Sequence, residues 1–278
     1  MITNQPGIEL VDVRLENPRG GMPLVDEANM RVTGGERVLV VGAAGVGTSR
    51  LVATVLGEVA IAAGRIEVLG HDVGKLRRSS LRLLRRRVGI VPQDLCLIED
   101  RSAQLNVVLP LEIDGVPRAE SIVRAARVLA LLGLEAEAAL PVDQLSMAAR
   151  QRVAVARALV REPALLIADH PTSAQDAEGA ELVCAAIADA ARRGTACLAF
   201  GRDPALRTIA ERDGWRQLAM IHGSLRPLSE IVLDGLALDE LLSEPSAPTV
   251  RAPDITDLDD LLPNVLPFPI AARPAGAR

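Results

Sequence analysis

The sequence has almost no aromatic residues: it contains no tyrosine, two phenylalanines and one tryptophan among 278 residues. An apolar core must therefore be built from Leu, Val, Ile and Ala, which supply most of the 49% of residues that are hydrophobic. The sequence also lacks an apolar run long enough to span a bilayer, and its N-terminus lacks the basic and apolar pattern of a signal peptide. These absences predict a protein without a membrane-spanning helix that stays in the cytosol.

Cysteine and histidine are scarce as well, with three of each. Cys96, Cys184 and Cys197 form no C-x-x-C pair, and the histidines stand alone, so the sequence predicts reduced thiols and no zinc site. The formal net charge of −5 argues against a nucleic-acid-binding surface over the whole protein.

The stretch that organises the chain is Val38–Arg50, which reads V-L-V-V-G-A-A-G-V-G-T-S-R. Its apolar residues, Val38–Val41, predict a strand buried on both faces of a parallel sheet. Gly42, Gly45 and Gly47 then permit a turn that points backbone N–H groups at the start of a helix, where the helix dipole attracts an anion. The pattern predicts a phosphate-binding loop, although glycine-rich turns of this kind also occur for packing alone.

The loop departs from the spacing G-x-x-x-x-G-K-[ST] at one position. Gly42 and Gly47 stand correctly, and Ser49 occupies the position of the hydroxyl that holds Mg²⁺. Thr48, however, occupies the position of the lysine. Arg50 does not replace it, because two residues turn a helix by about 200° and direct its side chain away from the loop.

The rest of the chain alternates strands with helices, which predicts an α/β fold with a mainly parallel sheet. Further buried strands are expected at 88–91, 164–168 and 196–200, and helices at 51–59, 118–132, 177–192 and 204–212. Another helix should begin after Ser146 and stop at Pro163. An antiparallel hairpin is expected over residues 8–33, with another strand at 64–68 and a small strand pair near 218–225.

Six motifs follow one another in order: G-A-A-G-V-G-T-S at Gly42, V-P-Q-D at Val91, L-S-M-A-A-R-Q-R at Leu145, L-L-I-A-D-H-P-T at Leu165, S-A-Q-D at Ser173 and F-G-R-D at Phe200. This set resembles the nucleotide-binding subunit of an ABC (ATP-binding cassette) system over about residues 8–226. The stretch N-V-V-L-P-L-E-I-D-G-V-P at Asn106 is similar to the lipoprotein-release, cell-division and macrolide-export cassettes. The resemblance implies a P-loop NTPase-type sheet, mainly parallel, with an N-terminal antiparallel β part and an α-helical signature subdomain at about 94–160.

The resemblance also implies a site for ATP and Mg²⁺. Nucleotide contacts would come from Gly42, Gly45, Gly47, Thr48, Ser49, Arg50, Gln93 and Ser146. The metal would be held by Ser49, Gln93 and Asp169. His170 occupies the position of the catalytic glutamate, and Arg202 occupies that of the switch histidine.

Working members of the family differ from this chain at the positions that act on the nucleotide. They carry Lys at the position of Thr48, two Gly at the positions of Met147 and Ala148, Glu at that of His170 and His at that of Arg202. Near the position of Asn17 they carry an aromatic residue that stacks on the base. His170 is interpreted either as a substitute base or as a polar group at a strand end, and Arg202 either as an arginine finger or as part of an ion pair. We expect ATP binding to be weak or absent and hydrolysis to be lost or strongly impaired.

Residues 229–278 form an acidic, proline-containing extension to a cassette at 1–228. Two short amphipathic pieces begin at Val232 and Ile255. The composition predicts a flexible tail; alternatively, its leucines dock on a partner cassette or fold back towards the basic segment 75–87. That segment is itself expected to be a solvated helix face, with a patch for lipid or RNA as the alternative.

The sequence therefore favours a degenerate pseudo-ATPase that scaffolds or regulates a membrane transport or envelope complex. Its implied partners are a membrane permease subunit and another cassette, as homodimer or heterodimer, and no nucleic acid; its implied place is the cytoplasmic face of the membrane. The alternatives are an active ABC ATPase that powers a permease with a partner cassette, and a soluble regulatory protein that reuses the fold.

Overall fold

The computed structural model describes residues 6–18, 20–42, 47–221 and 223–233. Gly45 and nearly all of the acidic extension lie outside these residues. The chain divides into a unit of residues 1–243 and a second unit of residues 244–278, and every helix and strand described below belongs to the first. The expected domain boundary at 228 and the docking role of the extension stay predictions.

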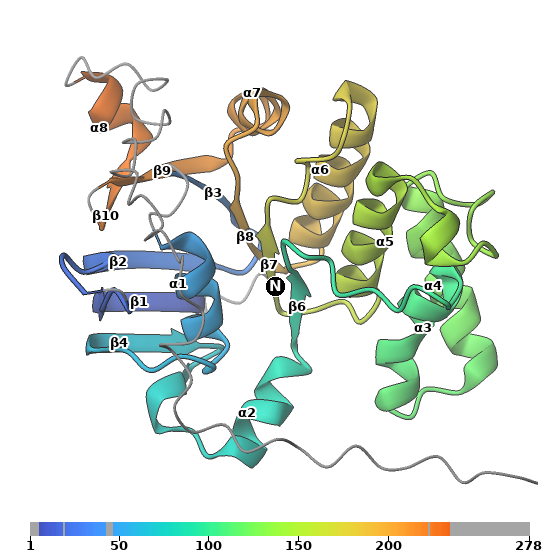
Figure 1. The fold of residues 1–278 in the computed structure, drawn as a ribbon, viewed down its shortest axis with the longest axis horizontal. Coiled ribbons are helices and arrows are strands. Elements are labelled where there is room, and N and C mark those ends of the chain that lie inside the picture. The colour runs from blue at the N-terminus through green and yellow to red at the C-terminus, as the bar shows by residue number, and fades with distance from the viewer. Residues whose placement is uncertain (1–5, 19, 43–46, 222, 234–278) are drawn as a thin grey trace, which may run out of the picture. The chain divides into compact units, whose positions relative to one another are not determined.

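The central sheet has the strand order β10-β9-β3-β8-β7-β6 (Figure 1). Its strands are β3 (Arg37–Gly42), β6 (Val88–Val91), β7 (Leu165–Asp169), β8 (Ala196–Phe200), β9 (Arg216–Ile221) and β10 (Ser224–Pro227). All neighbours pair in parallel except β10, which runs antiparallel to β9. Both faces are covered, which is why β7 and β8 are apolar runs without alternation. The expected buried strands are confirmed to within one residue.

A second, antiparallel sheet has the order β2-β1-β4-β5 and contains the expected hairpin. Its strands are β1 (Pro6–Leu15), β2 (Val25–Thr33), β4 (Ala63–Val68) and β5 (His71–Asp72). One core lies between this sheet and β3, because Ile8 and Leu10 are buried in the same cluster as Val38 and Val40. Gly64 is required by its positive φ of 83°, and a Cβ there would lie 2.2 Å from the carbonyl oxygen of Asp12.

The helices are α1 (Thr48–Val55), α2 (Arg78–Arg85), α3 (Ala103–Ile113), α4 (Arg118–Leu131), α5 (Met147–Leu159), α6 (Ala177–Arg192), α7 (Pro204–Arg212) and α8 (Leu228–Leu233). The expected bounds of α6 and α7 are confirmed. The helix expected to continue from the loop through 51–59 is too long at its C-terminal end: α1 runs over Thr48–Val55 and stops there because Gly57 adopts a positive φ of 67°. Helix α2 buries only Leu84, so the basic segment contains an exposed helix; the choice between a solvated face and a patch for lipid or RNA stays a prediction.

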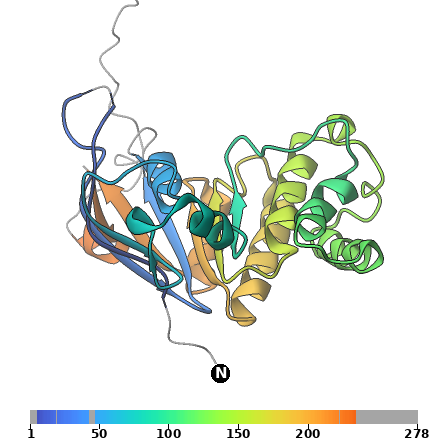
Figure 2. The same ribbon diagram turned by 90° about the horizontal axis from the view of Figure 1, so that it is seen from below.

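Helices α3, α4 and α5 pack on one another and form the helical part of the predicted fold. Figures 1 and 2 show this group on one side of the central sheet and the antiparallel sheet on the other. Helix α3 was not expected from the sequence, since Pro110 lies inside it. In the part of the chain described here, no helix is both long and apolar enough to cross a membrane.

Candidate functional site

The carboxyl ends of the parallel strands meet at one edge of the central sheet and border a cleft. Its volume is about 600 Å³, and it is lined by Ser49, Val52, Ala53, Leu56, Glu58, Ile90, Pro92, Gln93, Asp94 and Asp169. All three expected metal ligands are therefore present in one cleft. In parallel α/β sheets this edge is where ligands bind.

The N-terminus of α1 forms one wall of the site. Gly47 caps the helix with a φ of 100°, and a Cβ there would lie 3.0 Å from Cβ of Leu24, so this position requires glycine. No side chain caps the helix, and its first turn holds no acidic residue. The first N–H groups of a helix have no partner within it, so those of Thr48 and Ser49 can bind an anion.

Arg50 belongs to the same turn but not to the cleft, because it is not among the lining residues. Its Nε atom is buried and makes no hydrogen bond to any described residue. This agrees with a guanidinium that is directed away from the phosphate-binding loop.

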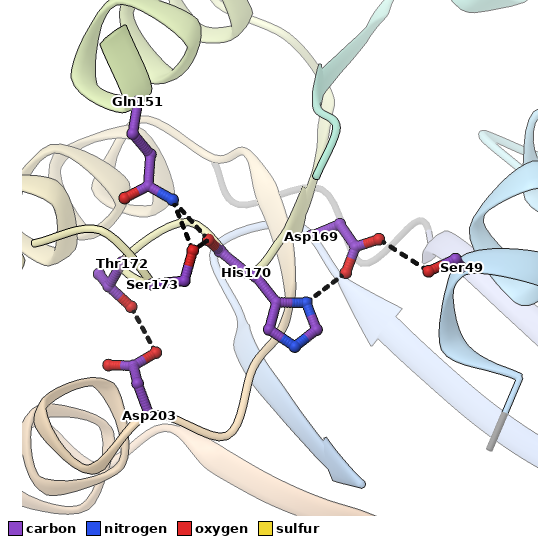
Figure 3. Close-up of polar contacts among 7 residues, drawn as sticks. All are labelled: Ser49, Gln151, Asp169, His170, Thr172, Ser173 and Asp203. Atoms are coloured by element: carbon purple, nitrogen blue, oxygen red, sulfur yellow. Dashed lines mark hydrogen bonds and ion pairs between the residues drawn. The ribbon is translucent and has the colours of Figure 1, made fainter. Parts of the chain in front are cut away.

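Asp169, at the end of β7, is the residue to which the polar groups of the site converge (Figure 3). Oγ of Ser49 lies 3.2 Å from its Oδ2 atom, and Nδ1 of His170 lies 2.8 Å from its Oδ1 atom. An ionised carboxylate only accepts hydrogen bonds, so the hydroxyl and the imidazole both donate. The oxygen atoms of Ser49, Gln93 and Asp169 are the ligand type that Mg²⁺ prefers, but both carboxylate oxygens of Asp169 already accept hydrogen bonds from the protein, so the set fits the metal only in part.

The backbone of His170 is held in an unusual conformation. Its φ is 52°, its N–H donates to the carbonyl oxygen of Phe200 at 2.7 Å, and its carbonyl oxygen accepts from Nε2 of Gln151 at 2.8 Å. A positive φ is uncommon for a residue other than glycine. Hydrogen bonds on both sides of the residue thus fix the backbone from which the imidazole projects.

Gln151 holds a loop of the site and was not identified from the sequence. Its side chain is 4% exposed and joins α5 to the loop after β7. Nε2 donates to His170 and to Oγ of Ser173 at 3.0 Å, while Oε1 accepts from the N–H of Ala174 at 3.1 Å and from Gln175 at 3.0 Å. One feature of the sequence indicates this role: Gln151 is polar but lies on the same face of α5 as the buried, apolar Val155, four residues later.

The structure does not bring Ser146 to the cleft. Ser146 caps α5, and its Oγ accepts a hydrogen bond from the N–H of Ala149 at 3.1 Å. Met147 is 59% exposed at the start of the same helix. It lines a separate cavity of about 260 Å³ whose lining includes Gln93 and Arg150.

Arg202 is exposed and makes no hydrogen bond or ion pair to any described residue, so the ion pair considered for it is not formed there. Its neighbour Asp203 makes two hydrogen bonds to described residues. Oδ1 of Asp203 accepts from the N–H of Leu206 at 2.9 Å and so caps α7, and Oδ2 accepts from Oγ1 of Thr172 at 2.8 Å. This contact ties the loop after β8 to the loop after β7.

The loop after Gln93 is anchored by Arg157 of α5. The guanidinium donates to the carbonyl oxygens of Leu95 and Cys96, both at 2.5 Å. Burial lowers the pKa of Arg157. A hydrogen bond to Asp94 raises the pKa of the exposed Cys96 thiol.

Three comparisons bear on this arrangement. A family model described as "ABC transporter" matches residues 25–173. The methionine import ATP-binding protein MetN of Mesorhizobium japonicum is 36% identical over 211 residues, which are 75% of this chain and 57% of that protein. MetN 2 of Burkholderia mallei is 39% identical over 185 residues, 66% of this chain and 47% of that protein. The chain thus spans about half the length of these curated relatives.

Solved structures of ABC transporter cassettes have the same fold as this chain. The dimeric, post-hydrolysis structure of the ATP-binding cassette MJ0796, bound to ADP and Pi, superposes with a TM-score of 0.70 at 26% identity, over 79% of this chain and 96% of that one. The ATP-binding subunit of another ABC transporter superposes with a TM-score of 0.71 at 21% identity, over 84% of this chain and 97% of that one. The predicted fold class is confirmed.

Proposed function

Since the chain belongs to the ABC transporter family and carries its ATP-binding cassette, we propose that it is a pseudo-ATPase subunit that scaffolds or regulates a membrane transport or envelope complex. The observation that carries the proposal is the imidazole of His170, hydrogen-bonded to Asp169 at the position where the family has a glutamate. A carboxylate that polarises the attacking water is worth about 10²–10⁴ in rate. Position 170 of this chain carries no such carboxylate.

Nucleotide binding is retained but weak in this proposal. The N–H groups at the start of α1 would hold phosphate oxygens, and Ser49, Gln93 and Asp169 would be the ligands for a weakly bound Mg²⁺. The ion would neutralise charge on the phosphates. Thr48 supplies no ammonium group, and the loss of such a charge-assisted hydrogen bond weakens affinity about ten- to a hundredfold.

The partners follow from the relatives. The MetN proteins are named as import ATP-binding proteins, and the MJ0796 cassette is dimeric. We extend this to a second cassette and a membrane permease for the present chain, at the cytoplasmic face of the membrane. The exposed side chain of Met147, where the family has glycine, would obstruct the close approach of the partner's nucleotide.

An active ATPase is the second candidate, and one observation favours it. Because Nδ1 of His170 is committed to Asp169, the ring has a fixed orientation and its Nε2 atom has no partner among the described residues. An imidazole oriented by a carboxylate in this way serves as a general base in other enzymes.

ATP turnover by the purified full chain separates the two candidates. We expect phosphate release no faster than that of an Asp169→Asn variant, which controls for contaminating ATPases. Several turnovers per second, abolished by that substitution, would refute the pseudo-ATPase. Purification from solubilised membranes tests the partners, and a chain that never co-purifies with a membrane protein would contradict the permease assignment.

A further inference from the structure

Both carboxylate oxygens of Asp169 are engaged by the protein itself. The side chain is 6% exposed, with Ser49 bonded to Oδ2 and His170 bonded to Oδ1. Figure 3 shows the imidazole beside the carboxylate, on the side away from Ser49. Each carboxylate oxygen of this expected metal ligand thus accepts a hydrogen bond from the protein.

The residue type at position 170 decides this arrangement. A glutamate is an acceptor when ionised, so it cannot donate to Asp169 and instead repels it. An imidazole carries a ring N–H and can donate. The substitution therefore turns a repulsive neighbour of the carboxylate into an attractive one.

The ring is also not free to swing away at little cost. The φ of 52° and the hydrogen bonds from His170 to Phe200 and from Gln151 to His170 fix the backbone from which the side chain projects. Gln151 in turn has all its polar positions filled by the loop after β7. The imidazole that contacts Asp169 therefore projects from a fixed backbone, and only rotation of its own side chain can break the contact.

We propose that His170 is a positioning residue that locks Asp169 against divalent cations, so that this site binds a nucleoside triphosphate with little dependence on Mg²⁺. The proposal rests on the proposed function only in taking this cleft as the nucleotide site. The Nδ1–H donor draws on the lone pairs of Oδ1 and its positive hydrogen repels a cation at that oxygen, so a cation binds Oδ1 more weakly while the hydrogen bond is kept. The lock reduces the gain in nucleotide affinity that Mg²⁺ provides by about tenfold.

The first test measures the affinity of the full chain for a fluorescent ATP analogue, in MgCl₂ and in EDTA. The readout is the ratio of the two dissociation constants. His170→Gly removes the donor and tolerates the positive φ, so the ratio should shift about tenfold in favour of Mg²⁺. His170→Asn keeps a donor near Nδ1 and also tolerates this backbone, so it should behave like the unmodified chain. His71→Asn, at an exposed position on β5, is the matched control.

An unchanged ratio in His170→Gly would overturn the lock, whatever the absolute affinity. The proposed function is tested separately, by the absolute affinity for ATP and by the turnover rate. A failure of the lock can therefore be told apart from a failure of the proposed function.

A second measurement needs no nucleotide. The chain has three histidines, so ¹⁵N-histidine NMR can resolve them, and the signals lost in His170→Asn assign the ring. We expect Nδ1 of His170 to carry a proton, because it faces Oδ1 of Asp169. An Nδ1 atom without a proton would overturn the lock even if no variant binds nucleotide.

Discussion

The hydroxyl of Ser49 lies 3.2 Å from a carboxylate oxygen of Asp169, although 120 residues separate them in the sequence. The sheet topology makes this contact. Strands β3 and β7 run parallel with only β8 between them, so both end at the same edge. The helix that follows β3 then starts beside the last residue of β7. The parts that bind a phosphate and a metal are therefore brought together by the strand order, independently of the residues that would perform hydrolysis.

Thr48→Lys should restore binding without restoring turnover. The new ammonium group reaches the phosphates from the first turn of α1, and affinity for ATP should tighten about ten- to a hundredfold. His170 and Met147 remain, so phosphate release should stay at the level of the unmodified chain. Ser79→Lys, which adds the same charge on the exposed α2, should change neither quantity. Calorimetric titration and a phosphate-release assay measure both; a large rise in turnover would contradict the role given to His170.

Gln151→Leu should destabilise the protein, because it removes the polar partner of His170, Ser173, Ala174 and Gln175 at a buried position. Leaving buried donors and acceptors unpaired costs about 1–3 kcal/mol for each group that cannot reach water. We expect a loss of about 2–4 kcal/mol in the free energy of unfolding, measured by urea denaturation.

Gln104→Leu on α3 is the control for that substitution. Its half-buried side chain makes no hydrogen bond to a described residue, so the free energy of unfolding should change by less than about 1 kcal/mol. Equal effects of the two substitutions would show that the amide of Gln151 does not hold the loop.

Gly89→Ala should destabilise the packing of β6 on α5. A Cβ at this position would lie 2.4 Å from the carbonyl oxygen of Ala158 and 2.9 Å from Cγ of Pro163, and the backbone oxygen cannot move aside. Overpacking of this kind costs about 1–3 kcal/mol. Gly74→Ala is the matched control, since its nearest new neighbour lies at 3.4 Å. Thermal melts of both variants make the comparison, and equal melting temperatures would contradict the close approach.

The sequence carried clear signals for much of this fold. Helix α7 was placed correctly because Asp203 caps it and Pro204 fixes its first turn. Helix α3 was missed because Pro110 normally ends a helix and because its apolar residues lie on all sides, which hides the helical period.

The site was predictable only in part. The family resemblance implied that Ser49, Gln93 and Asp169 would share one site, and they line one cleft. The contact between Asp169 and His170 was not predictable, because adjacent residues in extended backbone point to opposite faces. It depends on a positive φ at His170, which nothing local in the sequence indicates.

Alkaline pH should destabilise the protein through its two buried thiols. Burial raises the pKa of Cys184 and of Cys197 to about 12, from an ordinary value of 9.0. A folded-state pKa above the unfolded one favours the protonated, folded form, so the stabilisation is complete below about pH 9 and is lost as the pH rises toward 12. Each thiol should lower the free energy of unfolding by up to about 1.4 kcal/mol per pH unit in that window.

Few other side chains titrate in this alkaline pH range, because the chain has no tyrosine and a single lysine, Lys75. The change in stability can therefore be assigned to the thiols. Urea denaturation at a series of pH values from 8 to about 11 measures the slope. Cys184→Ala combined with Cys197→Ala should flatten it, even if the double variant is less stable at pH 8. Cys96→Ala should leave the slope nearly unchanged, because that thiol is exposed and its ionisation differs less between the folded and unfolded states. A slope that survives the double substitution would assign the alkaline instability to other groups.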